Sequence, residues 1–373
     1  MCDASVGDQL PSLLTHVADP VGFQSQPLSD TSLQAHRLRP PLVGFEHPRR
    51  IAGTPVRFLR EHMRVRRILV VYKKSAYHLY SRVRRDREFL RLLREDHLVT
   101  KRFVKSHEEL GRALGLVREI LRKRKIAARF VYRAYAFSER DYDLVLSVGG
   151  DGTFLEASHC IRSRPILGLN SNTLESVGSF CGTTVHTLNH TLDDIEHNRC
   201  SRTRMLRLRV RIARKIIPIP VLNDVLITHL NPAATCRYIV KYRNREEEHK
   251  SSGIWVATAA GSTGALSGAG GAFMPITSRD FQFRIRELYP EPHRKNRITG
   301  GIVRANEKLV VYSKIRAGRI FVDGPHVAYC FPIGARVEIS ATAPPLIVYG
   351  FNEGRRRKLW GREVIENGSR QLT

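Results

Sequence analysis

A short apolar run that leads directly into a glycine-rich loop is the feature that most constrains the fold of this chain. Residues Asp143–Val148 are typical of a buried strand, and the loop Gly149–Thr153, with the sequence GGDGT, follows at once. Glycines at the end of a strand let backbone N–H groups turn toward a phosphate, and the N-terminus of a following helix adds a favourable dipole. A helical stretch, Leu155–Arg162, does follow. The pattern predicts an α/β sheet with a phosphate site at its edge.

The residues before this loop fit the same architecture. The apolar run Ile68–Tyr72 predicts a strand, and the spacing of apolar residues predicts helices over Tyr80–Leu98 and Glu108–Lys125. Arg129–Arg133 predicts a further strand. The order strand, helix, helix, strand is the start of a parallel α/β sheet.

The second half of the chain has a different pattern. Leu206–Ile212 alternates apolar residues with Arg207, Arg209 and Arg211, which indicates a half-buried antiparallel strand with the arginines outside. Further strands are predicted at Val221–Ile227, Tyr238–Tyr242, Ile254–Thr258, Lys308–Tyr312, Arg319–Val322, Arg336–Ser340 and Leu346–Tyr349. We therefore expect a poorly ordered tail over 1–48, an α/β domain over 49–200 and an all-β domain over 201–373.

The net charge of +27 points either to nucleic acid or to small polyanionic substrates. Residues 49–128 hold 24 Lys and Arg against 8 Asp and Glu, a local charge of +16. Their aromatic residues form no stacking array and no RNA-binding module is recognisable, so the basic residues are predicted to be the solvated faces of helices. Binding of nucleic acid is therefore not expected as the main function, and a basic protein that binds nucleic acid or polyphosphate without turnover stays as an alternative.

Six cysteines are scattered through the 373 residues without a CxxC pair. This spacing argues against a disulfide scaffold and against a zinc ribbon. The first ten residues are acidic and lack the apolar core of a secretory signal, and no apolar run reaches the roughly 18 residues of a membrane span. A cytoplasmic protein with no membrane partner is the resulting prediction.

Three motifs carry the chemistry. Asp151 inside the glycine-rich loop would repel a phosphate unless a divalent cation or a hydroxyl proton lay between them, so a kinase-like role as proton acceptor from an alcohol is indicated. The small-residue stretch Gly253–Gly271, anchored by Trp255, implies close approach of the backbone to a ligand. Asn223 and Asp224 interrupt an apolar strand and can bind vicinal hydroxyls such as those of a ribose. Taken alone, the first and third motifs fit ordinary turns as well.

In this order and spacing, the three motifs resemble the NAD kinase family over roughly residues 65–350. GGDGT matches Gly149–Thr153, the family's Asn-Glu pair matches Asn223 and Asp224, and its TGSTAY-type loop matches Gly253 through Gly268. The segment FVDG at Phe321–Gly324 is also similar to the family. The longer segment Gly168–Phe180, and Ser252 in place of an aspartate, resemble the divergent mitochondrial-type branch. The loop also departs from the family at Gly264, Ala265 and Gly268, and the loss of its tyrosine removes an aromatic stacking surface.

The resemblance implies a Rossmann-like domain followed by a β-sandwich, with NAD bound between them, in a homodimer or homotetramer. It implies phosphoryl transfer from ATP or polyphosphate, with Mg²⁺ or another divalent cation, to the 2′-hydroxyl of the adenosine ribose of NAD. Asp151 matches the proton acceptor, and the donor phosphates match Gly149, Gly150, Gly152 and Thr153. The NAD-binding positions match Asp151, Gly152, Asn223, Asp224, Lys250, Thr263, Gly264, Ala265 and Gly268. No protein ligand to a metal is predicted.

Two further alternatives remain from the sequence. Kinases of other alcohols, lipids among them, share the GGDGT loop, although the Asn223 and Asp224 pair favours a ribose. An inactive nucleotide-binding relative would fit Ser252 and Ala265, whereas Asp151 argues for activity.

Overall fold

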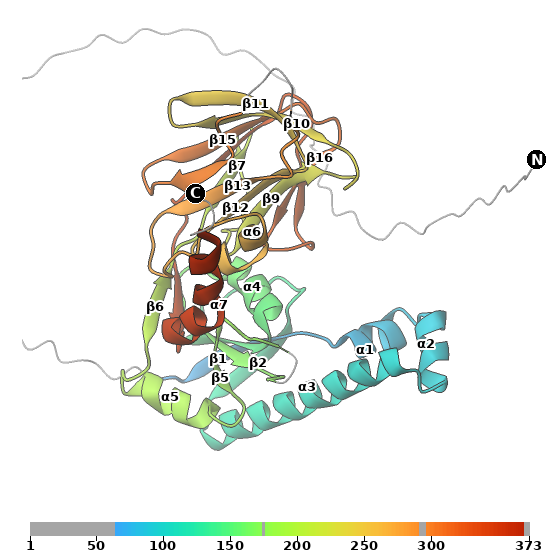
Figure 1. Cartoon of the computed structure of the whole chain (residues 1–373). Coiled ribbons are helices and arrows are strands. Elements are labelled where there is room, and N and C mark those ends of the chain that lie inside the picture. Colours follow the sequence, from blue (N-terminus) through green and yellow to red (C-terminus); the bar gives the residue numbers. More distant parts are fainter. Residues whose placement is uncertain (1–63, 174–175, 291–295, 369–373) are drawn as a thin grey trace, which may run out of the picture. The chain divides into compact units, whose positions relative to one another are not determined.

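The computed structural model describes residues 64–173, 176–290 and 296–368, all of which belong to one compact unit (Figure 1). The tail expected over 1–48 lies outside the described residues. Among the helices of these ranges, none combines the length and the apolar character needed to cross a bilayer.

A seven-stranded sheet forms the α/β part. Its strand order is β2-β1-β3-β4-β19-β6, with β5 beside β4, and all of its pairings are parallel except that of β6 with β19. The order confirms the parallel sheet that the run before GGDGT predicts. The strands are β1 (Arg67–Tyr72), β2 (Ala127–Tyr132), β3 (Leu144–Gly149), β4 (Ile166–Asn170), β5 (Cys181–Thr184), β6 (Arg202–Met205) and β19 (Leu346–Tyr349).

Helices cover both faces of this sheet. Successive residues of a strand point to opposite faces of the sheet. On one face, Ile68 and Val70 of β1 pack in the same cluster as α3 (Leu98–Lys123) and α5 (Leu188–Glu196). Leu69 and Val71 pack instead with α4 (Asp151–Cys160). The helix that starts at the glycine-rich loop therefore lies on the face opposite to α3.

The helical region after β1 differs from the sequence prediction. The single helix expected over Tyr80–Leu98 is instead two elements, η1 (Leu79–Val83) and α2 (Arg87–Arg94), and α1 (Ala76–His78) precedes them. α3 begins at Leu98, before the predicted Glu108. Arg85 has a φ of 50°, and the Asp86 side chain accepts the N–H of Phe89 as a new helix cap. The Phe89 ring then packs against both Tyr80 and Phe103, which requires the chain to turn back.

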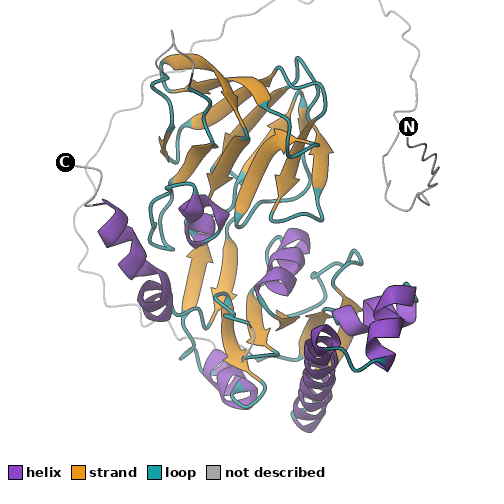
Figure 2. Ribbon diagram, turned by 45° about the vertical axis from the view of Figure 1, so that its right-hand side comes forward, coloured by secondary structure: helices purple, strands orange, loops and turns teal. Residues whose placement is uncertain are grey.

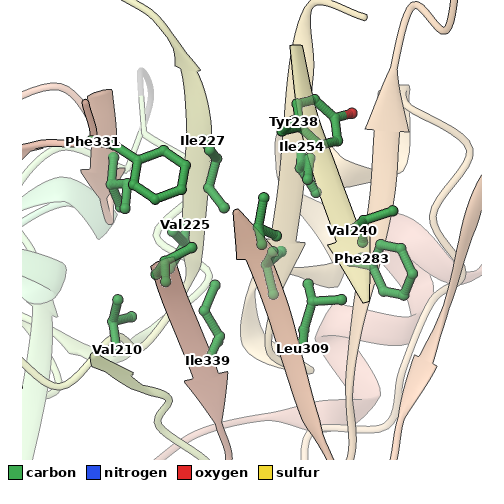
Figure 3. Close-up of a cluster of buried hydrophobic side chains, with 14 of the residues drawn as sticks. Val210, Val225, Ile227, Tyr238, Val240, Ile254, Phe283, Leu309, Phe331 and Ile339 are labelled. Atoms are coloured by element: carbon green, nitrogen blue, oxygen red, sulfur yellow. The ribbon is translucent and has the colours of Figure 1, made fainter. Parts of the chain in front are cut away.

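Two six-stranded antiparallel sheets form the second part, a β-sandwich (Figure 2). Alternate side chains of both sheets fill the space between them, among them Val210, Val225, Phe283 and Ile339 (Figure 3). The predicted combination of an α/β part with a β-sandwich is confirmed. One sheet contains β7 (Arg209–Ile212), β8 (Lys215–Ile216), β10 (Cys236–Tyr242), β11 (Arg245–Ser251), β15 (Lys308–Ser313) and β18 (Arg336–Ser340). The other contains β9 (Asp224–His229), β12 (Gly253–Ala257), β13 (Phe281–Arg286), β14 (Gly300–Val303), β16 (Gly318–Val322) and β17 (Ala328–Cys330).

Two expectations for the second half are wrong. The sequence pattern assigns Leu346–Tyr349 to the all-β part, but as β19 it pairs with β4 of the first sheet. Leu206–Ile212 is not one strand, and Arg207 is fully buried rather than on an outer face. Its guanidinium donates to the carbonyls of Ser158 and Ile161 at the end of α4, where backbone acceptors lack helical partners. The domain boundary at residue 200 stays a prediction.

Candidate functional site

The glycine-rich loop joins a buried strand to the helix that carries Asp151. β3 ends at Gly149, Gly150 is the N-cap of α4, and Asp151 is the first helical residue. A Cβ on Gly149 would lie 2.3 Å from Thr153 Oγ1 and 2.8 Å from Thr153 Cβ, so a larger residue would displace the start of the helix. The first N–H groups of a helix have no partner within it, and they favour an anion at this end.

The glycine-rich loop lies at the point in the sheet where the strand order reverses. From β1 the chain moves to β2 on one side and later to β3 on the other side. At such a switch point the connections diverge, which leaves a crevice outside the carboxyl ends of the strands.

A pocket of about 640 Å³ occupies this position. Residues that directly follow β1, β2 and β3 line it, together with residues of α1, η1 and α3. Among the lining residues, Asp151 supplies the carboxylate, and Leu79 and Phe103 supply large apolar side chains. The lining includes four cations, which suit a polyanionic ligand: Lys73, Lys74, Arg102 and Arg133.

Backbone N–H groups hold the Asp151 carboxylate in place. Ser179 N–H donates to Asp151 Oδ2 over 2.9 Å, and Phe180 N–H donates to Asp151 Oδ1 over 2.8 Å. The Phe180 ring stacks on Phe154 of α4 at 5.2 Å between centroids, which fixes the donors relative to the helix. Each carboxylate oxygen has a second lone pair, so Asp151 can still accept a hydrogen bond from a ligand hydroxyl.

The Asn223 and Asp224 pair is organised by Asp323. The Asp323 carboxylate accepts the backbone N–H groups of Leu222, Asn223 and Asp224 over 2.7–3.0 Å. It also contacts His159 Nε2 on α4 at 2.9 Å, and its side chain is fully buried. Asn223 Nδ2 donates to Asp224 Oδ2 over 2.8 Å, so the two side chains have one fixed relative arrangement.

Burial of Asp224 and the neighbouring Asp323 carboxylate raise the pKa of Asp224 to about 7, although the Asn223 hydrogen bond opposes this shift. Between its ordinary pKa of 3.8 and about 7, the folded protein keeps a proton on Asp224 that the unfolded chain has released. The contribution of this group to the free energy of unfolding therefore falls as the pH rises through that window.

We expect Asp224→Asn to remove this contribution. The melting temperature of the variant minus that of the wild type should become more positive between pH 5 and pH 8. Thermal unfolding of both proteins at several pH values measures the difference, and a difference independent of pH would contradict the raised pKa of Asp224.

The small-residue loop packs directly against the Asn223 and Asp224 pair. β12 pairs with β9 so that Ala257 lies opposite Asp224, and the chain then enters η2 (Ala260–Thr263) and α6 (Ala265–Gly268). A Cβ on Gly261 would lie 2.2 Å from the carbonyl oxygen of Asn223, and one on Gly264 would lie 3.4 Å from Asn223 Nδ2. Gly261 therefore allows the loop to approach the Asn223 backbone closely, while approach of this loop to a ligand stays a prediction.

Gly261→Ala should therefore destabilise the protein by about 1–3 kcal/mol, as overpacking of a tight contact does. Gly115→Ala is the matched control, because a Cβ at this position inside α3 meets no atom within 4 Å. Urea unfolding should rank Gly261→Ala below the wild type and Gly115→Ala at or above it. Equal stability of the two variants would mean that the loop can move away from Asn223.

A buried arginine of the last helix also holds this loop. Arg356 of α7 (Glu353–Gly368) donates to the carbonyls of Ala259 and Met274 and to Ser262 Oγ. Its burial lowers the pKa of the guanidinium. The sequence reasoning missed both Arg356 and Asp323 as site residues, although it singled out the FVDG segment that contains Asp323.

The remaining predicted residues fall into two groups. Thr263, Gly264, Ala265 and Gly268 lie in the loop beyond the end of β12 that is next to Asp224, and Ala265 and Gly268 are exposed. Lys250 lies in β11, before the opposite end of β12, with its ammonium 4.0 Å from the centre of the Tyr289 ring. The structure does not bring Lys250 together with Asn223 and Asp224.

Helix α4 connects the glycine-rich loop to the Asn223 and Asp224 pair. Asp151 is its first residue, and His159, which contacts Asp323, lies eight residues on, or about 12 Å along the axis. Leu222 and Ala260 pack in the same buried cluster as Phe154 of α4. The arrangement places the Asn223 and Asp224 pair near one end of α4 and the glycine-rich loop at the other end.

Comparison with known proteins gives a family match for the first part of the chain. Residues 62–200 match the ATP-NAD kinase N-terminal domain. A protein of Oryza sativa subsp. japonica named "Probable NADH kinase" is 34% identical over 230 residues, which cover 56% of this chain and 71% of the relative. An Arabidopsis thaliana "NADH kinase" is 33% identical over 261 residues, which cover 64% of this chain and 82% of the relative.

Solved structures share the fold. An NAD kinase from Archaeoglobus fulgidus, in complex with ATP, superposes with a TM-score of 0.54 at 20% identity, covering 79% of this chain and 97% of the other. Yeast NADH kinase, complexed with NADH, superposes with a TM-score of 0.55 at 14% identity, covering 83% of this chain and 89% of the other.

Proposed function

This chain belongs to the NAD kinase family, and we propose that it transfers the terminal phosphoryl group of ATP to the 2′-hydroxyl of the adenosine ribose of NAD. The observation that carries the proposal is the four-cation pocket at the switch point of the sheet, into which the glycine-rich loop presents Asp151. The comparisons do not favour a lipid kinase or a nucleic-acid-binding protein.

In the proposed reaction the 2′-oxygen attacks the γ-phosphorus, and the bond from that phosphorus to the β,γ-bridging oxygen breaks. Asp151 accepts the proton that the hydroxyl loses, and ADP leaves with the electron pair of the broken bond. Gly149, Gly150, Gly152 and Thr153 hold the donor phosphates through the loop and the N-terminus of α4. Protein groups supply orientation and charge, which are the main catalytic contributions in phosphoryl transfer.

Asn223 and Asp224 are proposed to bind ribose hydroxyls. The remaining dinucleotide contacts are assigned to Thr263, Gly264, Ala265 and Gly268, which lie beyond the same end of β12. Lys250 also belongs to the proposed set, on the strength of the family resemblance. Its position at the far end of β12 means that it acts on a more distant part of the ligand than Asp224 does.

A divalent cation, Mg²⁺ in the proposal, enters with the donor. Among the described residues, no group of three or more His, Cys, Asp or Glu side chains is arranged to hold a metal ion. Mg²⁺ commonly binds through substrate phosphates, with one or two protein ligands and several waters. When bound, the cation would neutralise phosphate charge in the pocket.

The proposal extends to a homodimer or homotetramer and to a cytoplasmic location. The family resemblance supports the oligomer, which light scattering of the purified protein tests. Five cysteines in the described ranges are free, as is usual in a reducing compartment. Imaging of a tagged full chain tests the location.

Incubation of the purified protein with NAD, ATP and Mg²⁺, followed by detection of NADP with an NADP-specific dehydrogenase, tests the function. Parallel reactions with inorganic polyphosphate as donor and NADH as acceptor define the substrates. Formation of NADP is the expected result, and its absence with both donors would contradict the proposal.

A further inference from the structure

Arg133 places a guanidinium directly beside the glycine-rich loop. It follows β2, the edge strand next to β1, and lines the same pocket as Asp151. Its Nη1 atom is 3.5 Å from Thr153 Oγ1 and 3.7 Å from the position that a Cβ of Gly152 would occupy. The cation thus lies against the backbone of the loop, at the N-terminal end of α4.

Glu156 holds this guanidinium in one orientation. Arg133 Nε lies 3.1 Å from Glu156 Oε2, one turn further along α4 than Thr153. Both side chains are mostly buried, with 22% and 18% of their surface exposed. Glu156 Oε1 in turn lies 3.9 Å from His326 Nε2, which follows the FVDG segment. Because Glu156 binds the Nε side of the fork, the terminal nitrogens stay directed at the loop and the pocket.

Resting on the proposed function, we propose that Arg133 binds the donor phosphate chain and stabilises the charge on the phosphoryl group during transfer. Glu156 is the positioning residue that fixes the Arg133 guanidinium for this task. A planar guanidinium can donate two parallel hydrogen bonds to phosphate oxygens, and a fixed donor does not have to be reorganised during the reaction. Arg133 is therefore a catalytic residue in addition to Asp151.

The two lysines of the pocket differ from Arg133 in the shape of their cationic groups. Lys73 and Lys74 follow β1 and are point charges on flexible stems. The Lys74 ammonium lies 4.8 Å from the centre of the Tyr132 ring. Arg133 combines contact with the loop and a carboxylate partner on α4.

The test compares Arg133→Gln, Arg133→Lys and the matched control Arg129→Gln, in which an exposed arginine of β2 is lost. Arg133→Gln should lower kcat/KM for ATP by about 100-fold, the usual loss when one preorganised donor is removed. KM for NAD should change little. The kcat/KM for ATP of Arg133→Lys should be about tenfold higher than that of Arg133→Gln, because lysine keeps a positive charge but lacks the planar guanidinium. Titration with a non-hydrolysable ATP analogue should show weaker binding by Arg133→Gln and wild-type binding by Arg129→Gln.

Glu156→Gln completes a double-mutant cycle. Alone it should lower kcat by about 5–10-fold, whereas in the Arg133→Gln background it should have no further effect, since it acts through Arg133. If the wild type forms NADP and Arg133→Gln matches Arg129→Gln in kcat and in analogue binding, the role of Arg133 is wrong while the proposed function stands. If the wild type itself forms no NADP, the proposed function fails. Additive losses in the cycle would overturn the positioning role of Glu156.

Discussion

Asp151→Asn is expected to lower kcat for NADP formation by about 10³-fold, within the range for loss of a general base. Asparagine has nearly the same shape but cannot take up the proton of the 2′-hydroxyl. It also offers one acceptor oxygen where the carboxylate offers two to Ser179 and Phe180, so a modest loss of stability accompanies the substitution. Initial rates at saturating NAD and ATP measure the effect.

Asp141→Asn is the control for this variant, because it makes the same change at an exposed loop position before β3. It should retain the wild-type kcat. Binding of NAD to Asp151→Asn, followed by calorimetry, should be preserved to within about tenfold if the site stays folded. A variant with wild-type turnover would show that the proton acceptor is a different group.

Asp323→Ala is the second substitution with a large expected effect. It leaves the N–H groups of Leu222, Asn223 and Asp224 without their acceptor in a buried place, which should reduce the free energy of unfolding by about 3 kcal/mol. KM for NAD should rise as well, since the Asn223 and Asp224 pair loses its anchor. Urea unfolding and steady-state kinetics measure the two effects.

Asp323→Asn separates the role of the charge from that of the hydrogen bonds. Asparagine tolerates the left-handed backbone of this residue, whose φ is 49°, and keeps one acceptor oxygen. Its effect on stability should be smaller than that of alanine. Because the Asp323 charge helps to raise the pKa of Asp224, the pH dependence of NAD binding should shift to lower pH in this variant. An unshifted pH profile, or equal stability of the alanine and asparagine variants, would contradict the role given to Asp323.

Local patterns along the chain predict the sheet around the phosphate loop. The run Asp143–Val148 and the GGDGT sequence are local features, and they correctly place a buried strand, a tight loop and a helix in succession. The same reasoning fails for Arg207, whose alternation with leucines indicates an outer face. Arg207 is buried because the carbonyl groups at the end of α4 need donors, and no local pattern records a contact across 46 residues.

β19 and β11 show two further limits of the sequence patterns. The apolar run of β19 is equally suited to a sandwich core and to the middle of a parallel sheet, and only its pairing with β4 decides between them. β11, with the sequence REEEHKS, lies at the edge of its sheet and has no apolar run to mark it. It was not predicted.

The candidate site was predictable where its residues are neighbours in the chain. Asn223 and Asp224 are adjacent, and they do lie against the small-residue loop that was expected to meet a ligand. Arg356 donates to Ala259, 97 residues earlier in the chain, and Asp323 contacts Asn223 across 100 residues. Lys73 and Arg133 could have been predicted from the sequence. Lys73 directly follows the predicted strand Ile68–Tyr72, and Arg133 is the last residue of the predicted strand Arg129–Arg133. The carboxyl ends of parallel strands lie together at one edge of the sheet.

In the proposed reaction the phosphoryl group goes to the 2′-hydroxyl of the adenosine ribose. Incubation with NAD and ATP labelled in the γ-phosphate, beside a reaction with an NAD analogue that lacks this hydroxyl, tests it most directly. We predict labelled NADP from NAD and no labelled dinucleotide from the analogue. Label in the analogue, or label in NAD at any other position, would contradict the claim.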